Sequence, residues 1–458
     1  MIRTHISKVK WLFSLFVVLS LNAQNDVSLL FVGDVMQHDG QIQAAYNKTT
    51  GEYEYNDGFK FVKPIINKYD FAVANLEVTL AGQPYKGYPQ FSAPDQLAET
   101  LIQSGFNVII TANNHSCDRG AQGVLRTLDV LDELGVKHTG TFRDQAERDK
   151  NYPLMLEKDG MKIAMLNYTY GTNGLSVKAP LIINYIDSAV IRKDVARAKE
   201  LKADLIVCNM HWGIEYKPLP NDYQKKYEQF CYDLGVDMVI GNHPHVVQPI
   251  EKKEVNGKDK LTVWSLGNFV SNMSVRYTRG GVMLGAHVEK GEKGIEIKSA
   301  EDWLVYVYKR QEGPVMQYYI LPDYQYNRVL PGFIGESDLE KMKEFFSDSR
   351  ELYAENNIGV TEQKVLKFPE ITSLYKKYLT SYYSVELTDA SDELLKNENA
   401  IAFLHGTLDD AGKEYILSGV CETIEQAEGN AKFIEDCGLS KSLRIVKVTP
   451  EKVEEVEK

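Results

Sequence analysis

Short apolar runs alternate with amphipathic segments over the first two thirds of the chain. The runs are rich in β-branched and other apolar residues, which is typical of buried strands. Six of them are Val27–Asp34, Phe71–Glu77, Asn107–His115, Ala203–Gly213, Val236–His245 and Thr262–Phe269. Between them lie segments such as Gly123–Gly135, which has apolar residues at helical spacing and ends at a glycine. This alternation predicts an α/β domain over residues 27–320, with a largely buried sheet.

Polar residues of the kinds that form sites stand at the C-terminal ends of these runs. In open α/β sheets that edge is where sites form, so we expect these side chains to gather in one polar site. Each has an ordinary alternative role when taken alone, such as helix cap, turn residue or surface histidine. The set comprises Asp34, Asn75, Glu77, Asn114, His115, His211, His243, His245 and Asn268.

The chain changes character after about residue 320. Residues 321–384 contain two charged amphipathic patterns, Ser337–Asn357 and Glu370–Tyr383, which predict a helical extension packed on the main domain or on a partner. Residues 385–458 include a strand, helix, strand pattern that predicts a small α+β domain. This last segment faintly resembles the SPOR-type peptidoglycan-binding domain, and a docking or dimerisation unit is the alternative.

The first residues have the composition of a secretory signal peptide. A positive region with Arg3, Lys8 and Lys10 precedes the apolar run Trp11–Leu21, and Ala23 offers a small residue for cleavage. The run is short for a membrane span, so residues 1–23 predict export to the periplasm or cell surface. An uncleaved anchor or a buried helix is the alternative.

Charge and cysteine usage narrow the class of protein. The chain has 52 Lys and Arg against 64 Asp and Glu, a net charge of −12, which argues against a general nucleic-acid binder. Its 5 cysteines are widely spaced and form no disulfide framework, although a pair between Cys421 and Cys437 stays open. The sequence does not indicate an oligomeric state.

The gathered polar residues form a set of metal donors. Asp34 and Glu77 offer carboxylates, Asn114 offers an amide oxygen, and three histidines offer nitrogens. His243 and His245 can aim two rings at one point if the backbone between them is extended. Mixed nitrogen and oxygen ligands suit Zn, Mn, Fe or Mg.

A neighbouring pair of residues offers proton chemistry. His115 is placed to protonate a leaving group or to stabilise developing charge. Asp118 could hold the His115 ring in one tautomer, or it could cap the helix that follows it.

Six motifs together resemble a known family. "FVGDVM", "FAVANLEVTL", "TANNHSCDRGAQGVLRTLDVL", "MHWGIEY", "GVDMVIGNHPHVVQPIE" and "WSLGNF" occur in the order and spacing of the CapA/PgsA family, the PGA_cap group of bacterial capsule synthesis proteins. The resemblance covers Ser28 to Val288 and departs from the family at Asn242 and Arg119. This family is similar to the calcineurin-like metallophosphoesterases, which implies a four-layer α/β/β/α sandwich around a two-metal site.

The resemblance also implies which residues hold metal. The aspartate that opens the metallophosphoesterase pattern corresponds to Asp34, but the histidine two residues later corresponds to Met36, which is no comparable ligand. Glu77 takes the position of the bridging carboxylate. The resemblance therefore implies one firm metal held by Glu77, Asn114, His211 and His243, and a second, weak or absent metal held by Asp34, Glu77 and His245.

Further residues near these motifs are candidates for binding substrate. Trp212 would be a wall of the site or part of the core, and Asn268 would orient a ligand or cap a turn. Arginine binds carboxylate or phosphate through its planar fork, although surface arginines are usually solvated. The candidates are Asn75, Arg119, Trp212, Glu215, Gln248, Asn268, Arg276 and Arg279.

Three functions are compatible with these features. The resemblance implies a role in the synthesis, export or attachment of an anionic polymer such as poly-γ-glutamate or capsule, beside membrane-bound synthesis proteins and with metal-assisted hydrolysis or transfer as the chemistry. A periplasmic metallophosphoesterase is the second hypothesis, against which Met36 speaks. A non-catalytic scaffold that binds polymer is the third.

Overall fold

A computed structural model gives the fold of the chain. The predicted signal segment, residues 1–23, and Cys437 lie outside the described residues. These are 26–291, 294–313, 315–323, 334–363, 381–388, 404–408, 414–421, 423–436, 440, 442–449, 452–456. Among them, no helix is both long enough and apolar enough to cross a membrane. Cys117, Cys208, Cys231 and Cys421 are buried free thiols.

The first of two large sheets contains the N-terminal strand and three antiparallel strands from residues 280–322. Its order is β16-β15-β14-β1-β2-β3-β4, with β13 paired to β1 and β17 paired to β15. Strands β1 to β4 and β13 are parallel, whereas β14 to β16 are antiparallel. The strands are β1 (Asp26–Val35), β2 (Phe71–Leu76), β3 (Val108–Ile110), β4 (Lys137–Thr139), β13 (Asn268–Val270), β14 (Gly280–Gly291), β15 (Gly294–Glu312), β16 (Val315–Pro322) and β17 (Thr361–Glu362).

The second sheet has a parallel centre and antiparallel edges. Its order is β11-β12-β10-β9-β7-β6, in which β7, β9, β10 and β12 run parallel. The strands are β6 (Leu154–Lys158), β7 (Met161–Thr169), β9 (Leu205–His211), β10 (Met238–Asn242), β11 (Ile250–Val255) and β12 (Lys258–Val263). A short ribbon pairs β5 (Thr141–Phe142) with β8 (Ile182–Ile183).

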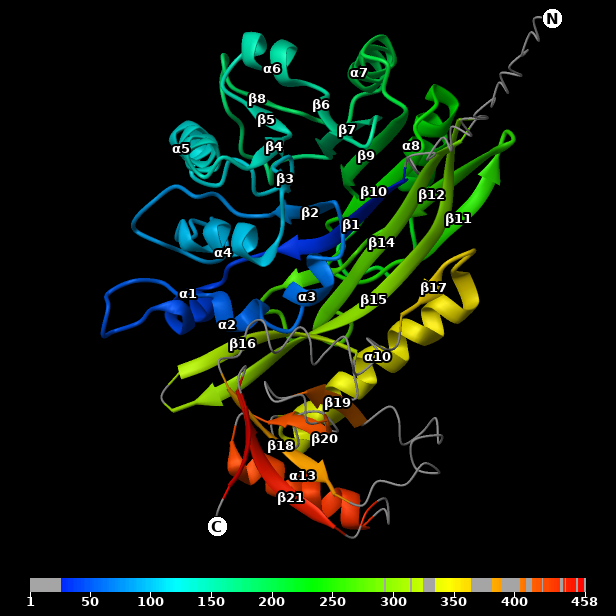
Figure 1. Ribbon diagram of the computed structural model, residues 1–458. Helices are drawn as coiled ribbons and strands as arrows, with labels where there is room; N and C mark the ends of the chain where they lie inside the picture. The colour runs from blue at the N-terminus through cyan, green and yellow to red at the C-terminus, as the bar shows by residue number, and fades with distance from the viewer. Residues whose placement is uncertain are drawn as a thin grey trace, which may run out of the picture.

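The helices complete the outer layers of a sandwich (Figure 1). They are α1 (Asp39–Ala45), α2 (Asn56–Phe59), α3 (Lys63–Ile66), α4 (Gln96–Ser104), α5 (Gly120–Glu133), α6 (Gln145–Asn151), α7 (Ser188–Glu200) and α8 (Asp222–Leu234). Helices α3, α4 and α5 contribute side chains to the large core that contains the first sheet. Helices α7 and α8 pack on the second sheet in a separate core.

Strand β7 shows how the period-two pattern builds these layers. Ile163 and Met165 face the core shared by the two sheets, while Leu166 and Tyr168 face the core under α7 and α8. Successive strand residues point to opposite faces, so a strand that is apolar on both faces must be covered on both. The predicted four-layer α/β/β/α sandwich is therefore confirmed.

The C-terminal part contains one long helix and a small antiparallel sheet. Helix α10 (Glu336–Asn356) matches the first amphipathic pattern beyond residue 320. The sheet, in the order β19-β20-β18-β21-β22, is covered on one side by α13. Its elements are β18 (Tyr382–Leu387), β19 (Leu404–Leu408), β20 (Glu414–Cys421), α13 (Ile424–Asp436), β21 (Leu443–Val448) and β22 (Val453–Glu455).

The structure bears on two expectations for the C-terminal part: a strand, helix, strand pattern and a second amphipathic helix. The strand, helix, strand order is present as β20, α13 and β21. The second predicted helix, Glu370–Tyr383, lies mostly outside the described residues, and its last two residues, Tyr382 and Tyr383, belong to β18 instead. The aromatic residues at the end of this segment are equally compatible with a strand, which the prediction of a helix did not take into account.

Helix α10 holds a loop of the main domain. Its residues Phe345 and Phe346 pack into the large core. On its surface, Asp348 accepts two hydrogen bonds from Arg276, and Glu344 lies 2.7 Å from Arg279. Both arginines belong to the loop between β13 and β14, which α10 therefore ties down.

Candidate metal centre

The polar side chains predicted from the strand ends come together between the two sheets. Asp34 is the penultimate residue of β1, Glu77 follows β2, and His211 ends β9. Two groups have ligand atoms within 4.8 Å of one another: Asp34, Glu77 and His211, and Glu77, His243 and His245. All five residues are buried.

Close backbone packing fixes the position of Asp34 between the two sheets. The preceding Gly33 lies so close to the turn before β13 that a Cβ atom would stand 2.1 Å from the Gly267 carbonyl oxygen. The Asp34 amide donates to that same oxygen at 2.8 Å. Asn75, its partner on β2, donates to Asp34 Oδ1 at 2.9 Å, which fixes the carboxylate plane.

Glu77 is the shared member of both groups, and its carboxylate has no hydrogen-bond partner. It is fully buried, and both Oε1 and Oε2 are unpartnered. Burial raises the pKa of Glu77 well above its ordinary value, and the charge of Asp34 raises it further. An unpartnered buried carboxyl group is costly. A bound cation would remove that cost, so the residues present fit a divalent metal.

Two of the histidines are held as neutral imidazoles. Burial lowers the pKa of His211 well below its ordinary value and lowers the pKa of His243 to about 3. His211 Nε2 lies 2.7 Å from Asn114 Oδ1 and 3.4 Å from Glu77 Oε1, and His243 Nδ1 has no partner. Neutral imidazole is the form that binds metal, so both rings are ready to serve as ligands.

His245 is oriented by the residues behind it. Its Nδ1 lies 3.0 Å from Asp34 Oδ2 and 3.1 Å from Asn268 Oδ1, while its Nε2 lies 3.8 Å from Glu77 Oε1. Burial lowers the pKa of His245, but the bonds with Asp34 and Asn268 outweigh it and raise the pKa overall. Such bonds at one ring nitrogen orient the other nitrogen toward the metal.

The backbone of the His-x-His element differs from the prediction. His243 has φ of 102° and His245 has φ of 56°, so both are left-handed rather than extended. Non-glycine residues in this region are strained and cluster at functional sites. The two ring centroids are nevertheless 6.0 Å apart, because the turn at Pro244 brings both rings toward Glu77.

The grouping of the donors into two metal positions stays a prediction. Glu77 belongs to both groups of donors, the ring centroids of His211 and His243 are 4.9 Å apart, and His245 Nδ1 lies 3.0 Å from Asp34 Oδ2. Met36 is buried in the apolar core, and His38 bonds with Gln41 and the Asn272 amide and belongs to neither group.

His115 and Asp118 form a buried pair beside the donors. Their Nδ1 and Oδ2 atoms are 2.7 Å apart, and the same oxygen accepts from the Phe91 amide at 2.8 Å. The Phe91 ring packs edge-on against His115 with centroids 4.6 Å apart. Helix α5 begins after Arg119, which is its N-cap, so Asp118 does not cap the helix.

Three of the predicted substrate-binding residues adjoin the centre. Asn75 contacts Asp34, and Asn268 contacts His245. Glu215 is half-buried, and its charge raises the pKa of Glu77 after the larger effects of burial and Asp34. Asn268 begins β13 rather than following a strand, so its amide reaches both His245 and the Thr278 carbonyl.

The structure places the other predicted substrate-binding residues elsewhere. Trp212 is fully buried, stacks on Trp264 at 6.1 Å and donates to its carbonyl, so it belongs to the outer core and is no wall of the site. Gln248 is buried and donates to the Lys217 carbonyl. Arg276 and Arg279 are paired with carboxylates of α10, and Arg119 stands at the N-cap position of α5 without a capping bond from its side chain.

Sequence reasoning missed several residues around the centre. Asn113 donates to the Leu76 carbonyl at 2.8 Å and so anchors the loop that carries Asn114. The Tyr170 ring lies 4.5 Å from the His243 ring, and the Tyr216 ring lies 6.3 Å from the His245 ring. Tyr170 directly follows β7, so the rule about strand ends would have found it had β7 been recognised as a strand.

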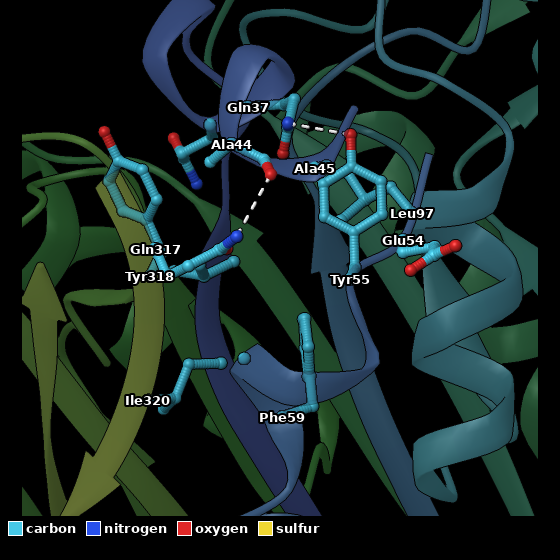
Figure 2. Close-up of a pocket in the computed structure, with 13 residues that line it drawn as sticks. Gln37, Ala44, Ala45, Glu54, Tyr55, Phe59, Leu97, Gln317, Tyr318 and Ile320 are labelled. Carbon is cyan, nitrogen blue, oxygen red and sulfur yellow. Dashed lines mark hydrogen bonds between the residues drawn. The ribbon is translucent and has the colours of Figure 1, made fainter. Parts of the chain in front are cut away.

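Two cavities lie away from the metal centre. Figure 2 shows one of about 30 Å³ beside α1 and β16, where Gln37 donates to the Tyr55 hydroxyl and Gln317 donates to the Ala44 carbonyl. It has room for about one water molecule. The other, of about 420 Å³, lies beside α6 and the end of α7. Neither includes a predicted ligand.

Comparison with known proteins gives one family and several distant structures. Residues 28–273 match the family described as "Bacterial capsule synthesis protein PGA_cap". The "PGA biosynthesis protein CapA" of Bacillus subtilis is 30% identical over 279 residues, which are 58% of this chain and 69% of that protein. The "Capsule biosynthesis protein CapA" of Bacillus anthracis is 26% identical, and the match spans 57% of this chain and 64% of its length.

Solved structures that are similar share little sequence with the chain. The NAD nucleotidase of Haemophilus influenzae has a TM-score of 0.39 and 14% identity, covering 77% of this chain and 59% of that one. The calcineurin-like phosphoesterase YfkN of Bacillus subtilis has a TM-score of 0.38 and 12% identity, covering 72% and 98%.

Proposed function

The chain belongs to the PGA_cap family of bacterial capsule synthesis proteins, and from this membership we propose that it acts on a capsule polymer with a divalent metal. The polymer would be poly-γ-glutamate or an acidic polysaccharide, cleaved or transferred at an amide or ester bond. The action would take place outside the cytoplasmic membrane, next to membrane-bound proteins that make or export the polymer. Residues 1–23 support export as a predicted signal peptide.

The unpartnered carboxylate of Glu77 carries the proposal. A folded protein rarely buries a carboxylate without any hydrogen-bond partner, because desolvation alone costs several kcal/mol, on the order of the whole stability of a domain. Here the same carboxylate stands between two groups of buried donors. The metal would be held by Asp34, Glu77, His211, His243 and His245, with the amide oxygen of Asn114 beside His211.

When bound, a divalent metal supplies Lewis-acid polarisation of a carbonyl or phosphoryl oxygen and lowers the pKa of bound water. The residues of the chain do the rest. Asp118 holds the proton of His115 at Nδ1, which leaves Nε2 to exchange a proton with the substrate. Asn268 and Asp34 keep His245 in one orientation, and Phe91 packs against His115 to keep bulk water from that ring.

The test measures metal and turnover on the same preparations. Full-length wild-type protein and the Glu77→Gln variant would be purified, and metal content would be determined by elemental analysis. Turnover would be followed on poly-γ-glutamate, on an acidic capsule polysaccharide and on p-nitrophenyl phosphate. Glu340→Gln serves as the matched control, since Glu340 is a solvent-exposed residue of α10 that pairs with Lys343 at 3.1 Å.

We expect wild type and Glu340→Gln to retain metal and to release polymer fragments, while Glu77→Gln loses both. Metal with turnover of the phosphate ester alone would replace the proposal with a phosphoesterase. Metal without any turnover would replace it with a binding scaffold. Equal metal content in wild type and Glu77→Gln would contradict the assignment of the centre itself.

A further inference from the structure

Three exposed tyrosines lie near residues of the metal centre. Tyr170, Tyr216 and Tyr88 are 41%, 49% and 68% exposed, although the first two pack on buried histidines and the third on buried Phe91. We call this set the tyrosine rim. An exposed aromatic ring leaves a large apolar face in water, and several together mark a binding surface.

Two members of the tyrosine rim contact histidines of the centre directly, and the third reaches His115 through Phe91. The Tyr170 ring packs 4.5 Å from His243, and the Tyr216 ring lies 6.3 Å from His245. Tyr88 packs at 6.4 Å on Phe91, which also packs on His115 and His38. The three rings therefore adjoin three different residues in or beside the same centre.

The backbone fixes Tyr216 in place at a conformational cost. Its φ is +65°, in the left-handed region that a tyrosine rarely adopts. Its amide donates to the Pro244 carbonyl at 2.8 Å, which ties it to the strained His-x-His turn. Strain of this kind persists where the surrounding structure imposes it, and it concentrates at sites of function.

The charge near the tyrosine rim is acidic. Glu215 is half-buried and directly precedes Tyr216 in the chain. Asp118 adds a second carboxylate near the centre, with its Oδ2 atom 2.7 Å from His115 Nδ1.

Two of the arginines predicted to bind substrate are engaged elsewhere. Arg276 bonds to Asp348 through two nitrogens, and Arg279 contacts Glu344. A run of γ-linked glutamates would therefore meet Glu215 and the tyrosine rim without these arginines to pair with. Such a run carries a carboxylate on every unit, more than a sugar chain in which only some units are acidic, and like charges beside one another in an interface disfavour binding.

We infer that the tyrosine rim is a sugar subsite, so that the polymer unit held at the metal centre is a pyranose ring. The polarised C–H groups on the face of a pyranose pack on the negative face of an aromatic ring, as other positive edges do. Its hydroxyl groups can donate to Glu215 and exchange hydrogen bonds with the tyrosine hydroxyls. This inference rests on the proposed function and narrows its polymer to a polysaccharide.

The experiment compares two probes on the full chain by isothermal titration calorimetry. The first is chitohexaose, a neutral chain of six pyranose rings, and the second is a hexamer of γ-linked glutamate. The variants are Tyr170→Ala, Tyr216→Ala and Tyr170→Phe. Tyr46→Ala is the matched control, because Tyr46 is also exposed but packs on Tyr53.

We expect chitohexaose to bind more tightly than the glutamate hexamer by at least about tenfold. Each alanine variant should weaken the sugar by about tenfold or more, equivalent to about 1.4 kcal/mol. Tyr170→Phe keeps the aromatic face and should stay within about threefold of wild type, as should Tyr46→Ala. Tighter binding of the glutamate hexamer, or alanine variants that bind sugar like wild type, would overturn the sugar subsite.

The Glu77→Gln variant separates this inference from the proposed function. Its tyrosine rim is intact, so adding Tyr170→Ala should weaken chitohexaose by the same factor in Glu77→Gln as in wild type, although the metal has been lost. If metal and turnover depend on Glu77 but sugar binding does not depend on the tyrosines, the sugar subsite alone fails. If sugar binding depends on the tyrosines but metal content is the same in Glu77→Gln and wild type, the metal-dependent function alone fails.

Discussion

His115 Nδ1 lies 2.7 Å from Asp118 Oδ2 in a pair that is almost fully buried. The carboxylate fixes both the orientation of the ring and the nitrogen that carries the proton. Asp118 therefore positions His115 without contacting a substrate, and replacing it should affect turnover more than binding.

Asp118→Asn should lower kcat by about 10–100-fold, with KM and metal content unchanged. An asparagine can offer its amide nitrogen to His115 and so favour the wrong tautomer. The control is Asp132→Asn, because Asp132 forms a similar bond with His138 on the surface, at 3.0 Å. An equal loss in both variants, or a loss of metal in Asp118→Asn, would contradict a positioning role.

Glu77→Gln should change thermal stability in opposite directions with and without metal. After treatment with chelator, the raised pKa of Glu77 costs stability at neutral pH, since folding must either bury the charge or take up a proton; the glutamine removes this cost, so the Tm should rise by about 2–4 °C relative to wild type. With Mn²⁺ or Zn²⁺ added, wild type gains stability by binding and the variant does not. Differential scanning fluorimetry measures both, and curves that shift together would argue against a metal at Glu77.

The buried pair of Arg148 and Asp194 should matter for folding. Arg148 Nη2 lies 2.7 Å from Asp194 Oδ2, and their side chains are 9% and 4% exposed. Arg148→Met leaves a buried carboxylate without its cation and should cost about 3–5 kcal/mol in the free energy of unfolding. Urea denaturation measures the cost.

The matched control for that measurement lies on the same helix as Asp194. Arg197 pairs with Glu200 in solvent, so Arg197→Met should change the free energy of unfolding by less than about 0.5 kcal/mol. Similar costs for the two variants would show that burial does not determine the value of the Arg148 pair.

Stability should fall between about pH 6 and about pH 9 partly because of His287. The bond with Glu301 raises the pKa of His287 above 6.5. Burial would raise the pKa of Glu301, but bonds from His287 and Tyr69 lower it below 4.5. The pair thus stabilises the fold above about pH 4.5, and its contribution declines as the pH rises through the pKa of folded His287.

His287→Gln should remove part of this decline, by less than about 1 kcal/mol because the histidine is nearly half exposed. Urea denaturation at both pH values measures it. Lys298→Gln on the facing strand of the same hairpin is the control, since lysine keeps its charge over this range. A decline in His287→Gln as steep as in wild type would assign the pH dependence to other groups.

The ligand set was predictable because it depends on a simple rule of topology. Asp34, Glu77 and His211 stand at the ends of apolar runs, and parallel strands bring their C-terminal ends to one edge. That rule needs no knowledge of side-chain packing. It does not determine which donors are nearest to one another: His211 ends β9 and His243 follows β10, and their ring centroids are 4.9 Å apart.

Trp212 shows a prediction that the sequence could have corrected. His211 points into the site, and the next residue must point to the other face of the sheet. Trp212 therefore belongs with Trp264 under α8. Arg276 and Arg279 are different, because their carboxylate partners on α10 lie 72 and 65 residues further along the chain. No local sequence pattern reveals those contacts.

The contact between α10 and the loop that carries Arg276 and Arg279 bears on where the folding unit ends. The region shared with the family stops at residue 273. Beyond it, β14 pairs with β1, and α10 forms ion pairs with Arg276 and Arg279 of the loop before β14. A chain shortened to the family region would leave one side of β1 without its neighbour. Protein engineering that moves this centre into another context must therefore carry residues up to Asn356 with it.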